Sequence, residues 1–214
     1  TADHYKLLST TSCSVIKKSE RTKQKIIQTA NRLFYRRGYN RTSFTDIVDA
    51  SGVPRGNIYY YFRTKDEILL ATLEHRMSNI EKMLNDWDQR YETPQERLKR
   101  FVKVLIAGHE ATSLYGCPIG SINMELGKEQ PELQAHAGRM FRRLLDYFRY
   151  QFEAMGHSAQ HSRHHAMQLL SRAQGISMMT HVMRDPQIMQ DAESEIEHWI
   201  DTLIPNPTIP DKPA

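Results

Sequence analysis

The sequence is poor in cysteine, glycine and proline, and each shortage excludes a class of protein. Two cysteines among 214 residues, Cys13 and Cys117, cannot build a disulfide framework. Ten glycines and nine prolines are too few for a fibrous or wholly disordered chain. No apolar run approaches the roughly 18 residues that a membrane-spanning helix needs, and no secretory signal opens the sequence. We therefore expect a compact protein of the reducing cytoplasm that does not enter a membrane.

The motifs of several common enzyme families are also missing. The sequence contains no phosphate-binding loop, no G-x-S-x-G, no H-E-x-x-H and no G-x-G-x-x-G. We therefore predict a binding protein without a cofactor rather than an enzyme. No segment alternates apolar and polar residues with the period of two that is typical of strands. The fold class that the sequence predicts is all-α.

Positive charge is concentrated toward the start of the chain. Residues 1–66 carry 13 Lys and Arg against 5 Asp and Glu, whereas residues 67–214 carry 16 against 20. A basic segment joined to a mildly acidic body indicates that one part meets a polyanion. Chance clustering of solvated side chains is the alternative. A nonspecific DNA binder would instead spread its basic residues over the whole surface.

Three segments with helical periodicity predict a small head over residues 17–66. A basic amphipathic helix runs from about residue 19 to Gly38, and short helices follow at about 44–50 and 55–62. The break between the short helices reads Ser51-Gly52-Val53-Pro54, and two short helices joined by such a turn form a helix-turn-helix. Either Ser43 or Thr45 can cap the first of them. The side chains expected in the core of the head are Phe44, Ile47, Ile58 and Phe62.

The rest of the chain divides into three parts. Residues 67–204 contain further amphipathic helices and are expected to form a helical body. Pro94 and Pro118 are expected to open two of these helices, and the first should extend to about residue 113. Residues 1–16 have no clear period and are expected to be a loose leader. Residues 205–214 contain four prolines and are expected to form a tail without helix.

The segment 37–73 carries an ordered set of features and reads RGYNRTSFTDIVDASGVPRGNIYYYFRTKDEILLATL. After a basic first helix come a Thr-rich start of the second, a Gly-Val turn, a short helix with the aromatic run YYYF, and the TKDE start of a long helix. This order resembles the TetR family of transcriptional regulators over about residues 19–70. The resemblance implies a homodimeric repressor of a palindromic operator in double-stranded DNA. It also implies that a small-molecule or electrophile effector binds the body and releases the DNA.

The resemblance and the chemistry of the side chains together predict the DNA contacts. By the resemblance, the residues at base edges are Thr45, Arg55, Asn57 and Tyr60, and those at phosphates are Thr42, Ser43, Tyr61 and Lys65. Arginine can bond a guanine at two atoms, and asparagine can bond an adenine in the same way. Gly56 has no side chain that would keep the backbone from the DNA. Tyr59 is expected either to pack or to contact a phosphate.

The effector site in the body is predicted from helix phase alone. The expected lining residues are Met83, Trp87, Leu105, His109, Cys117, Met124, Phe148 and Met178. Simple core packing is the alternative for each of them. Cys117 lies in the segment YGCPIGS and is expected at or near the N-cap of a helix, where the positive helix end favours a thiolate. It is therefore either a sensor of electrophiles or a packed thiol.

Two further hypotheses concern the last two helices of the body. Helices at about 160–184 and 187–204 are candidates for the dimer interface, because two operator half-sites require two heads. Whether their apolar stripes face a partner or their own core stays open. His161 and His165 have the i, i+4 spacing of a metal-binding pair. No neighbouring cysteine or carboxylate completes such a site, so we predict no metal and favour a solvated or interface role.

Overall fold

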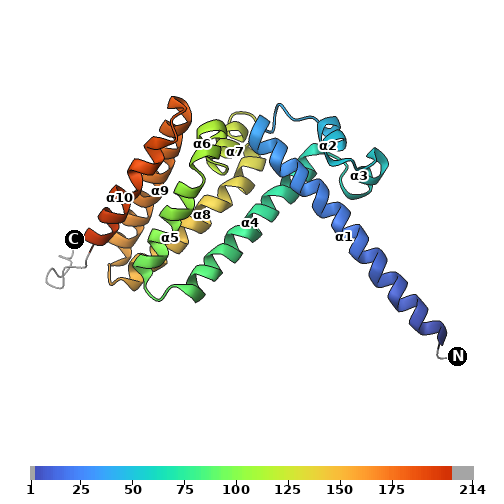
Figure 1. Cartoon of the computed structure of the whole chain (residues 1–214), viewed down its shortest axis with the longest axis horizontal. Helices are drawn as coiled ribbons and strands as arrows, with labels where there is room; N and C mark the ends of the chain where they lie inside the picture. The colour runs from blue at the N-terminus through green and yellow to red at the C-terminus, as the bar shows by residue number, and fades with distance from the viewer. Residues whose placement is uncertain (1–2, 204–214) are drawn as a thin grey trace. The chain divides into compact units, whose positions relative to one another are not determined.

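The computed structural model describes residues 3–203, with side chains from Lys18 onward. Every regular element among these residues is a helix, as the sequence predicted (Figure 1). The helices are α1 (Asp3–Arg37), α2 (Phe44–Ser51), α3 (Arg55–Tyr61), α4 (Lys65–Arg90), α5 (Pro94–Ala107), α6 (His109–Tyr115), α7 (Gly120–Leu126), α8 (Pro131–Ala154), α9 (Ala159–Met183) and α10 (Gln187–Thr202). Within this described range, no helix is both long and apolar enough to cross a membrane. The predicted tail at 205–214 lies outside the described residues.

Helix α1 begins well before the position that the sequence analysis expected. It starts at Asp3, so residues 3–16 are helical and differ from the loose leader expected there. Glycine and proline are the residues least favourable in a helix, and neither occurs before Gly38. The helix can therefore continue without interruption to Arg37. Gly38 then takes φ +85, a left-handed conformation that glycine adopts readily, and α1 ends.

The two helix starts predicted at prolines have different outcomes. Pro94 opens α5 as expected, and Thr93 caps this helix through a reciprocal pair of hydrogen bonds with Glu96. Helix α5 ends at Ala107 rather than near residue 113, because Gly108 separates it from α6. The prediction at Pro118 was wrong. Residues 118–119 form a turn, and α7 begins only at Gly120.

The chain folds into two compact units. The first comprises the residues up to Arg76 together with Glu125–His136, and the second comprises Met77–Met124 and the residues from Ala137 onward. The first therefore contains the predicted head, but it extends further along α4 than residue 66 and includes a later segment. The chain passes from one unit to the other three times, after residues 76, 124 and 136.

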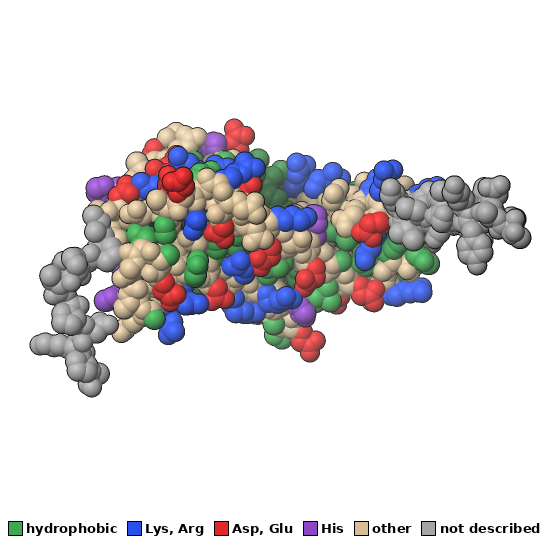
Figure 2. Space-filling view, turned by 90° about the horizontal axis from the view of Figure 1, so that it is seen from below, with side chains coloured by type: hydrophobic (Ala, Val, Ile, Leu, Met, Phe, Trp, Pro, Cys, Tyr) green, Lys and Arg blue, Asp and Glu red, His purple; other side chains and the backbone are tan. Residues whose placement is uncertain are grey.

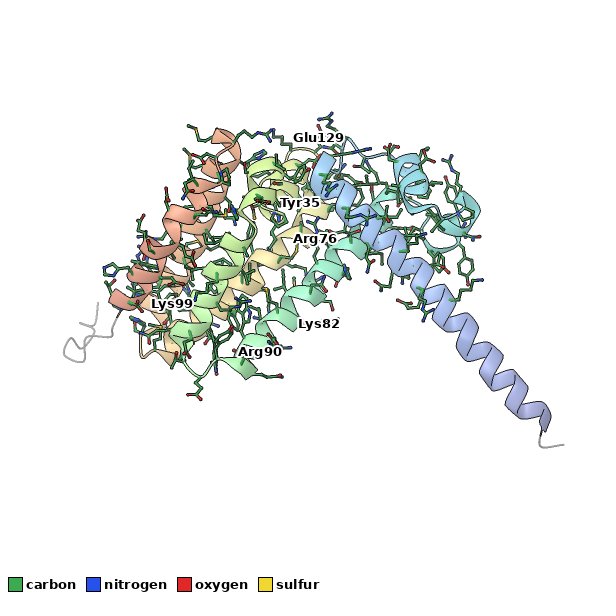
Figure 3. All side chains as sticks on the ribbon, viewed as in Figure 1. Tyr35, Arg76, Lys82, Arg90, Lys99 and Glu129 are labelled. Carbon is green, nitrogen blue, oxygen red and sulfur yellow. The ribbon has the colours of Figure 1, made fainter. Side chains whose placement is uncertain are left out.

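The core of the first unit is formed by one face of each of its helices. Ile47, Ile58 and Phe62 are buried, as the sequence predicted. Further buried side chains are Ile26, Ala30, Phe34, Val53, Ile68 and Leu69. Helix α4 is joined to α1 by a hydrogen bond from Nε of Arg76 to Oδ1 of Asn31, at 2.6 Å. Arg76 is labelled on α4 in Figure 3.

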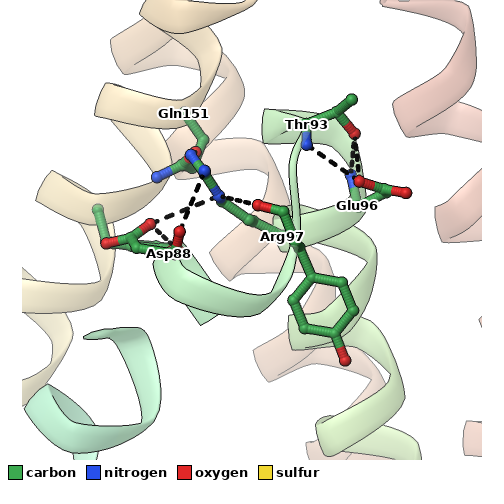
Figure 4. Close-up of polar contacts among 7 residues, drawn as sticks. Asp88, Thr93, Glu96, Arg97 and Gln151 are labelled. Atoms are coloured by element: carbon green, nitrogen blue, oxygen red, sulfur yellow. Dashed lines mark hydrogen bonds and ion pairs between the residues drawn. The ribbon is translucent and has the colours of Figure 1, made fainter. Parts of the chain in front are cut away.

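In the second unit, α5, α8, α9 and α10 lie alongside one another (Figure 1). Aromatic contacts join them, and the ring centroids of Phe101 and Phe148 lie 4.6 Å apart. Arg97 links α5 to two neighbours: Nη1 donates to Oε1 of Gln151 at 3.3 Å, and Nε lies 3.6 Å from Oδ1 of Asp88 (Figure 4). On the face shown in Figure 2, acidic and basic side chains are interspersed, which is typical of a solvated surface.

Candidate nucleic-acid interface

The start of α2 is fixed by a reciprocal pair of hydrogen bonds. The hydroxyl of Ser43 accepts the N–H of Asp46 at 3.1 Å, and the carboxylate of Asp46 accepts the N–H of Ser43 at 2.7 Å. The hydroxyl of Ser43 also donates to this carboxylate, and these bonds from Ser43 lower the pKa of Asp46. Ser43 is therefore the cap, and the exposed Thr45 is left available for another contact.

The turn between α2 and α3 has the geometry that a helix-turn-helix needs. Gly52 takes φ +61 and donates its N–H to the carbonyl of Val48 at 3.1 Å, which ends α2. Helix α3 starts directly after Pro54, whose carbonyl accepts the N–H groups of Asn57 at 2.8 Å and Ile58 at 3.1 Å. The ring of Pro54 restricts its φ to a value that suits a helix start. The predicted helix-turn-helix is present.

Helix α3 has one buried face and one exposed face. Ile58 is fully buried, and Phe62 at the end of the helix is buried as well. The exposed residues are Arg55, Gly56, Asn57, Tyr59 and Tyr60. Tyr60 is 77% exposed. The side chains of α3 that can read base edges therefore lie on the solvent face.

An aromatic stack supports this exposed face. The rings of Phe44 and Tyr59 are stacked with centroids 4.9 Å apart, and Arg55 lies over both. Phe44 was expected in the core but is half-buried. Its ring is stacked on Tyr59, a side chain that is itself exposed. Tyr59 thus packs against α2, which is one of the two roles expected for it.

The residues predicted at phosphates fall into two groups. Ser43 is exposed and caps α2, while Tyr61 is half-buried with its hydroxyl 2.9 Å from Oγ of Ser19. Thr42 differs from its expectation, because it is fully buried and its hydroxyl donates to the carbonyl of Gly38 at 2.6 Å. Nζ of Lys65 donates to the carbonyl of Tyr39 at 3.0 Å and lies 4.0 Å from the centroid of its ring. Thr42 and Lys65 therefore fix the loop between α1 and α2.

Sequence reasoning missed the part of α1 that lies beside α3. A surface cavity of about 380 Å³ is lined by Lys18, Ser19 and Thr22 of α1 and by Asn57, Tyr60 and Tyr61 of α3. Lys18 and Thr22 are four residues apart and so share a face of α1. The four-residue spacing of a cation and a hydroxyl is the sequence pattern from which this polar face of α1 could have been predicted. It adds polar groups of α1 to the exposed face of α3.

The residues predicted to line an effector site differ widely in exposure. Trp87 and Phe148 are buried in the core of the second unit, whereas Met124 and Met178 are 73% and 61% exposed. Met83, Leu105 and His109 are half-buried. Both ring nitrogens of His109 have partners, the carbonyl of Ile106 and the side chain of Gln190. Helix phase therefore selected both core and surface positions, and their common site stays a prediction.

Cys117 is a half-buried free thiol with two hydrogen-bond donors near its sulfur. The backbone N–H of Gly120 and Nε2 of Gln174 point at Sγ from 3.4 and 3.5 Å. Cys117 lies three residues before Gly120, the first residue of α7, and its carbonyl accepts the N–H of Ser121 at 2.9 Å, so it lies near the start of a helix, as the sequence predicted.

The histidines near the start of α9 form a cluster of rings. The ring centroid of His165 lies 4.9 Å from that of His157 and 6.3 Å from that of His161. Within the part of the chain that the structure describes, no group of three potential ligands is arranged to hold a metal ion. Burial lowers the pKa of His165. Nε2 of His157 lies 3.2 Å from the carbonyl oxygen of Leu203, which ties the end of α10 to this cluster.

The two helices considered for a dimer interface differ in exposure. The apolar residues of α10 are largely turned inward, and Ile196 and Ile200 are buried within the second unit. Helix α9, in contrast, exposes the large apolar side chains Met167, Met178, Met179, Val182 and Met183. The apolar stripe of α10 therefore faces its own core, and the solvent face of α9 is left apolar.

The helix-turn-helix and the helical body together define a class of DNA-binding transcriptional regulators. Two family models match the chain: residues 26–72 match "Bacterial regulatory proteins, tetR family", and residues 94–195 match the LmrA/YxaF-like C-terminal domain of transcriptional regulators. These segments cover the head and most of the body. The chain belongs to the TetR family.

Individual relatives agree with this assignment. An uncharacterized HTH-type transcriptional regulator from the lacX 3' region of Lactococcus lactis subsp. lactis is 27% identical over 172 residues, which cover 79% of this chain and 88% of the relative. The HTH-type transcriptional regulator LmrA of Bacillus subtilis is 28% identical over 117 residues, which cover 53% and 62%. The crystal structure of a TetR transcriptional regulator from Legionella pneumophila has the same fold. It aligns with a TM-score of 0.74 at 21% identity, over 85% of this chain and 96% of that one.

Proposed function

We propose that this regulator is a homodimeric repressor that binds a palindromic operator and leaves it when a small molecule binds the body. The observation that carries the proposal is the exposure pattern of α3. Ile58 fixes the helix in the head, while Arg55, Asn57 and Tyr60 face solvent. Arginine and asparagine are the side chains that most often read guanine and adenine in a major groove. A regulator of this kind acts where bacterial DNA lies, in the cytoplasm.

The proposed contacts follow from the positions described above. Arg55, Asn57, Tyr60 and the exposed Thr45 are proposed to face base edges, with the backbone at Gly56 close to the DNA. Ser43, Tyr61 and, through its remaining N–H donors, Lys65 are proposed to contact phosphates. Thr42 has no such role, because its hydroxyl is buried and bonded within the loop.

The exposed face of α9 supports the dimer. Large apolar side chains gathered on one helix face are typical of an interaction surface. Two heads are needed for two half-sites, so a second copy of this chain is the proposed partner of that face. The sequence analysis considered α9 and α10 together, and the burial of Ile196 and Ile200 favours α9.

Selection of duplexes from a random-sequence library at one fixed salt concentration tests the DNA-binding role. We expect enrichment of a short palindrome, because a symmetric dimer presents two copies of α3. Enrichment of an unsymmetric site would contradict the dimeric mode of reading. No enrichment over the starting library would contradict sequence-specific binding altogether.

Sedimentation of a double variant tests the dimer. Met178→Asp with Val182→Asp places two charges on the exposed face of α9, and we expect a monomer that has lost operator binding. Met124→Asp is the matched control, because Met124 is equally exposed but lies on α7. A dimer that persists in the double variant would show that another face makes the interface.

A further inference from the structure

Glu125, near the end of α7, holds the loop that leads into the helix-turn-helix. One oxygen of its carboxylate accepts the N–H of Tyr39 at 2.9 Å, and the other accepts the N–H of Asn40 at 2.7 Å. Because Glu125–His136 belong to the first unit, both bonds lie within the unit that contains α2 and α3. Hydrogen bonds to an ionised acceptor are about twice as strong as neutral ones. One side chain therefore fixes two consecutive peptide groups.

The loop is shaped to receive this carboxylate. Gly38 has φ +85, and a Cβ built at this position would lie 3.0 Å from each carboxylate oxygen of Glu125. The carbonyl groups of the loop are bonded as well: Gly38 accepts from Thr42, and Tyr39 accepts from Nζ of Lys65. The hydroxyl of Tyr39 donates to Asp66. The loop is thus held by Glu125 and by the start of α4.

Helix α7 connects this loop to the second unit through the chain itself. The helix begins at Gly120, within the second unit, and ends with Glu125 and Leu126 in the first. Leu126 is buried, which anchors the end of α7 in the head. The loop that Glu125 holds runs directly into Ser43, the cap of α2. A displacement of α7 would therefore act on the position of α2.

We propose that Glu125 is a positioning residue for operator binding, whose carboxylate keeps the α1–α2 loop, and with it α2 and α3, in the arrangement that reads DNA. Withdrawal of this carboxylate by a movement of α7 is the step that releases the operator. The inference rests on the proposed function and names the residue through which the body controls the head.

The sign of the effect distinguishes positioning from simple electrostatics. Removing a carboxylate from a basic head strengthens its attraction for DNA, so a pure charge effect raises affinity. Loss of a positioning contact lowers affinity for the selected palindrome. We expect Glu125→Ala to weaken binding to that duplex by about tenfold or more, and Glu125→Gln to weaken it less because one acceptor oxygen remains.

Glu129→Gln is the matched control, because Glu129 is an exposed acid on the same segment whose only described hydrogen bond is made by its backbone N–H. It should bind the palindrome as well as the unaltered chain does, or slightly better. Unfolding temperatures of all variants show whether each remains folded. Glu125→Gln keeps the size of the side chain and serves if Glu125→Ala does not fold.

Amide hydrogen exchange of the free protein provides a readout without DNA. In Glu125→Ala we expect faster exchange at Tyr39 and Asn40 and unchanged exchange at Ile58, whose N–H donates to the carbonyl of Pro54. Unchanged exchange at Tyr39 and Asn40, or affinity that rises as in Glu129→Gln, would overturn the role of Glu125 while the proposed function stands. An unaltered chain that selects no duplex would overturn the proposed function itself.

Discussion

The guanidinium carbon of Arg55 lies 5.8 Å from the centroid of the Tyr59 ring, so the free protein already holds this side chain against an aromatic surface. Tyr59 in turn is stacked on Phe44 of α2. A long side chain that is ordered before binding loses less conformational entropy when it meets a base. The stack therefore prepares Arg55 for a directed contact.

Arg55→Ala and Asn57→Ala should each weaken binding to the selected palindrome by about 1–3 kcal/mol, the range typical of a lost base contact. Binding to a random-sequence duplex should change far less. Arg63→Ala is the control, because it removes the same charge from an exposed position just after α3. Titration of both duplexes measures the difference. Equal losses on the two duplexes would argue against base reading by either residue.

Gly56→Ala separates what the fold needs from what the DNA needs. A Cβ at Gly56 would meet no atom within 4 Å, so alanine should raise the free energy of unfolding by about 0.5–1 kcal/mol through its better helix propensity. The same methyl group should weaken binding to the palindrome, because we propose that the backbone of α3 approaches the bases there. Thermal unfolding and titration of one sample measure both effects. Unchanged affinity would place Gly56 away from the DNA.

The positions of the core residues in the head could be predicted from the sequence, because burial of apolar side chains determines them. Ile58 and Phe62 are four residues apart, the spacing of one helix face, and Ile47 is an apolar residue of the preceding short helix, so all three are expected in the core. Thr42 and Lys65 were predicted less well, because their partners are carbonyl groups of a loop whose shape depends on Gly38 and on the distant Glu125. No local pattern in the sequence contains that information.

The body illustrates a second limit. Helix phase identified the apolar stripe of α10 but not the element that covers it, and Ile196 and Ile200 turned out to be buried in their own unit. Phase likewise marked Trp87 and Met178 as apolar positions, although one is in the core and the other faces solvent. The partner of an amphipathic face is set by tertiary packing, which a single sequence does not encode locally.

His165 should make the stability of the second unit depend on pH. Burial lowers its pKa below the usual value of 6.5, a hydrogen bond with Gln168 opposes this shift, and the neighbouring histidines lower the pKa further. The unfolded state therefore takes up a proton at a higher pH than the folded state does. The free energy of unfolding should then fall as the pH drops below about 6.5.

Urea unfolding at a series of pH values measures this dependence. His165→Phe keeps an aromatic ring beside Phe152 and Trp199 and should make the curve flatter between neutral and mildly acidic pH. The exposed His136 provides the control variant, His136→Gln, which should leave the curve as it is. An equally steep curve for His165→Phe would assign the pH dependence to other groups.

Cys117→Ser should make operator binding insensitive to thiol reagents. Cys117 is a free, half-buried thiol, so reaction with N-ethylmaleimide should occur at this residue and add a bulky group between α7 and α9. We expect the unaltered chain to lose affinity for the palindrome after treatment and Cys117→Ser to retain it. Cys13→Ser should behave like the unaltered chain.

The three passages of the chain between its units have a consequence for protein engineering. The order of the helices along the chain suggests two exchangeable modules, with the helix-turn-helix at the front and the helical body behind. Here the reading part is completed by Glu125–His136, which come from the middle of the sequence. A chimera that takes only the residues up to Arg76 would leave the amides of Tyr39 and Asn40 without their acceptor. The transplantable module consists of two pieces, and both must come from the same parent.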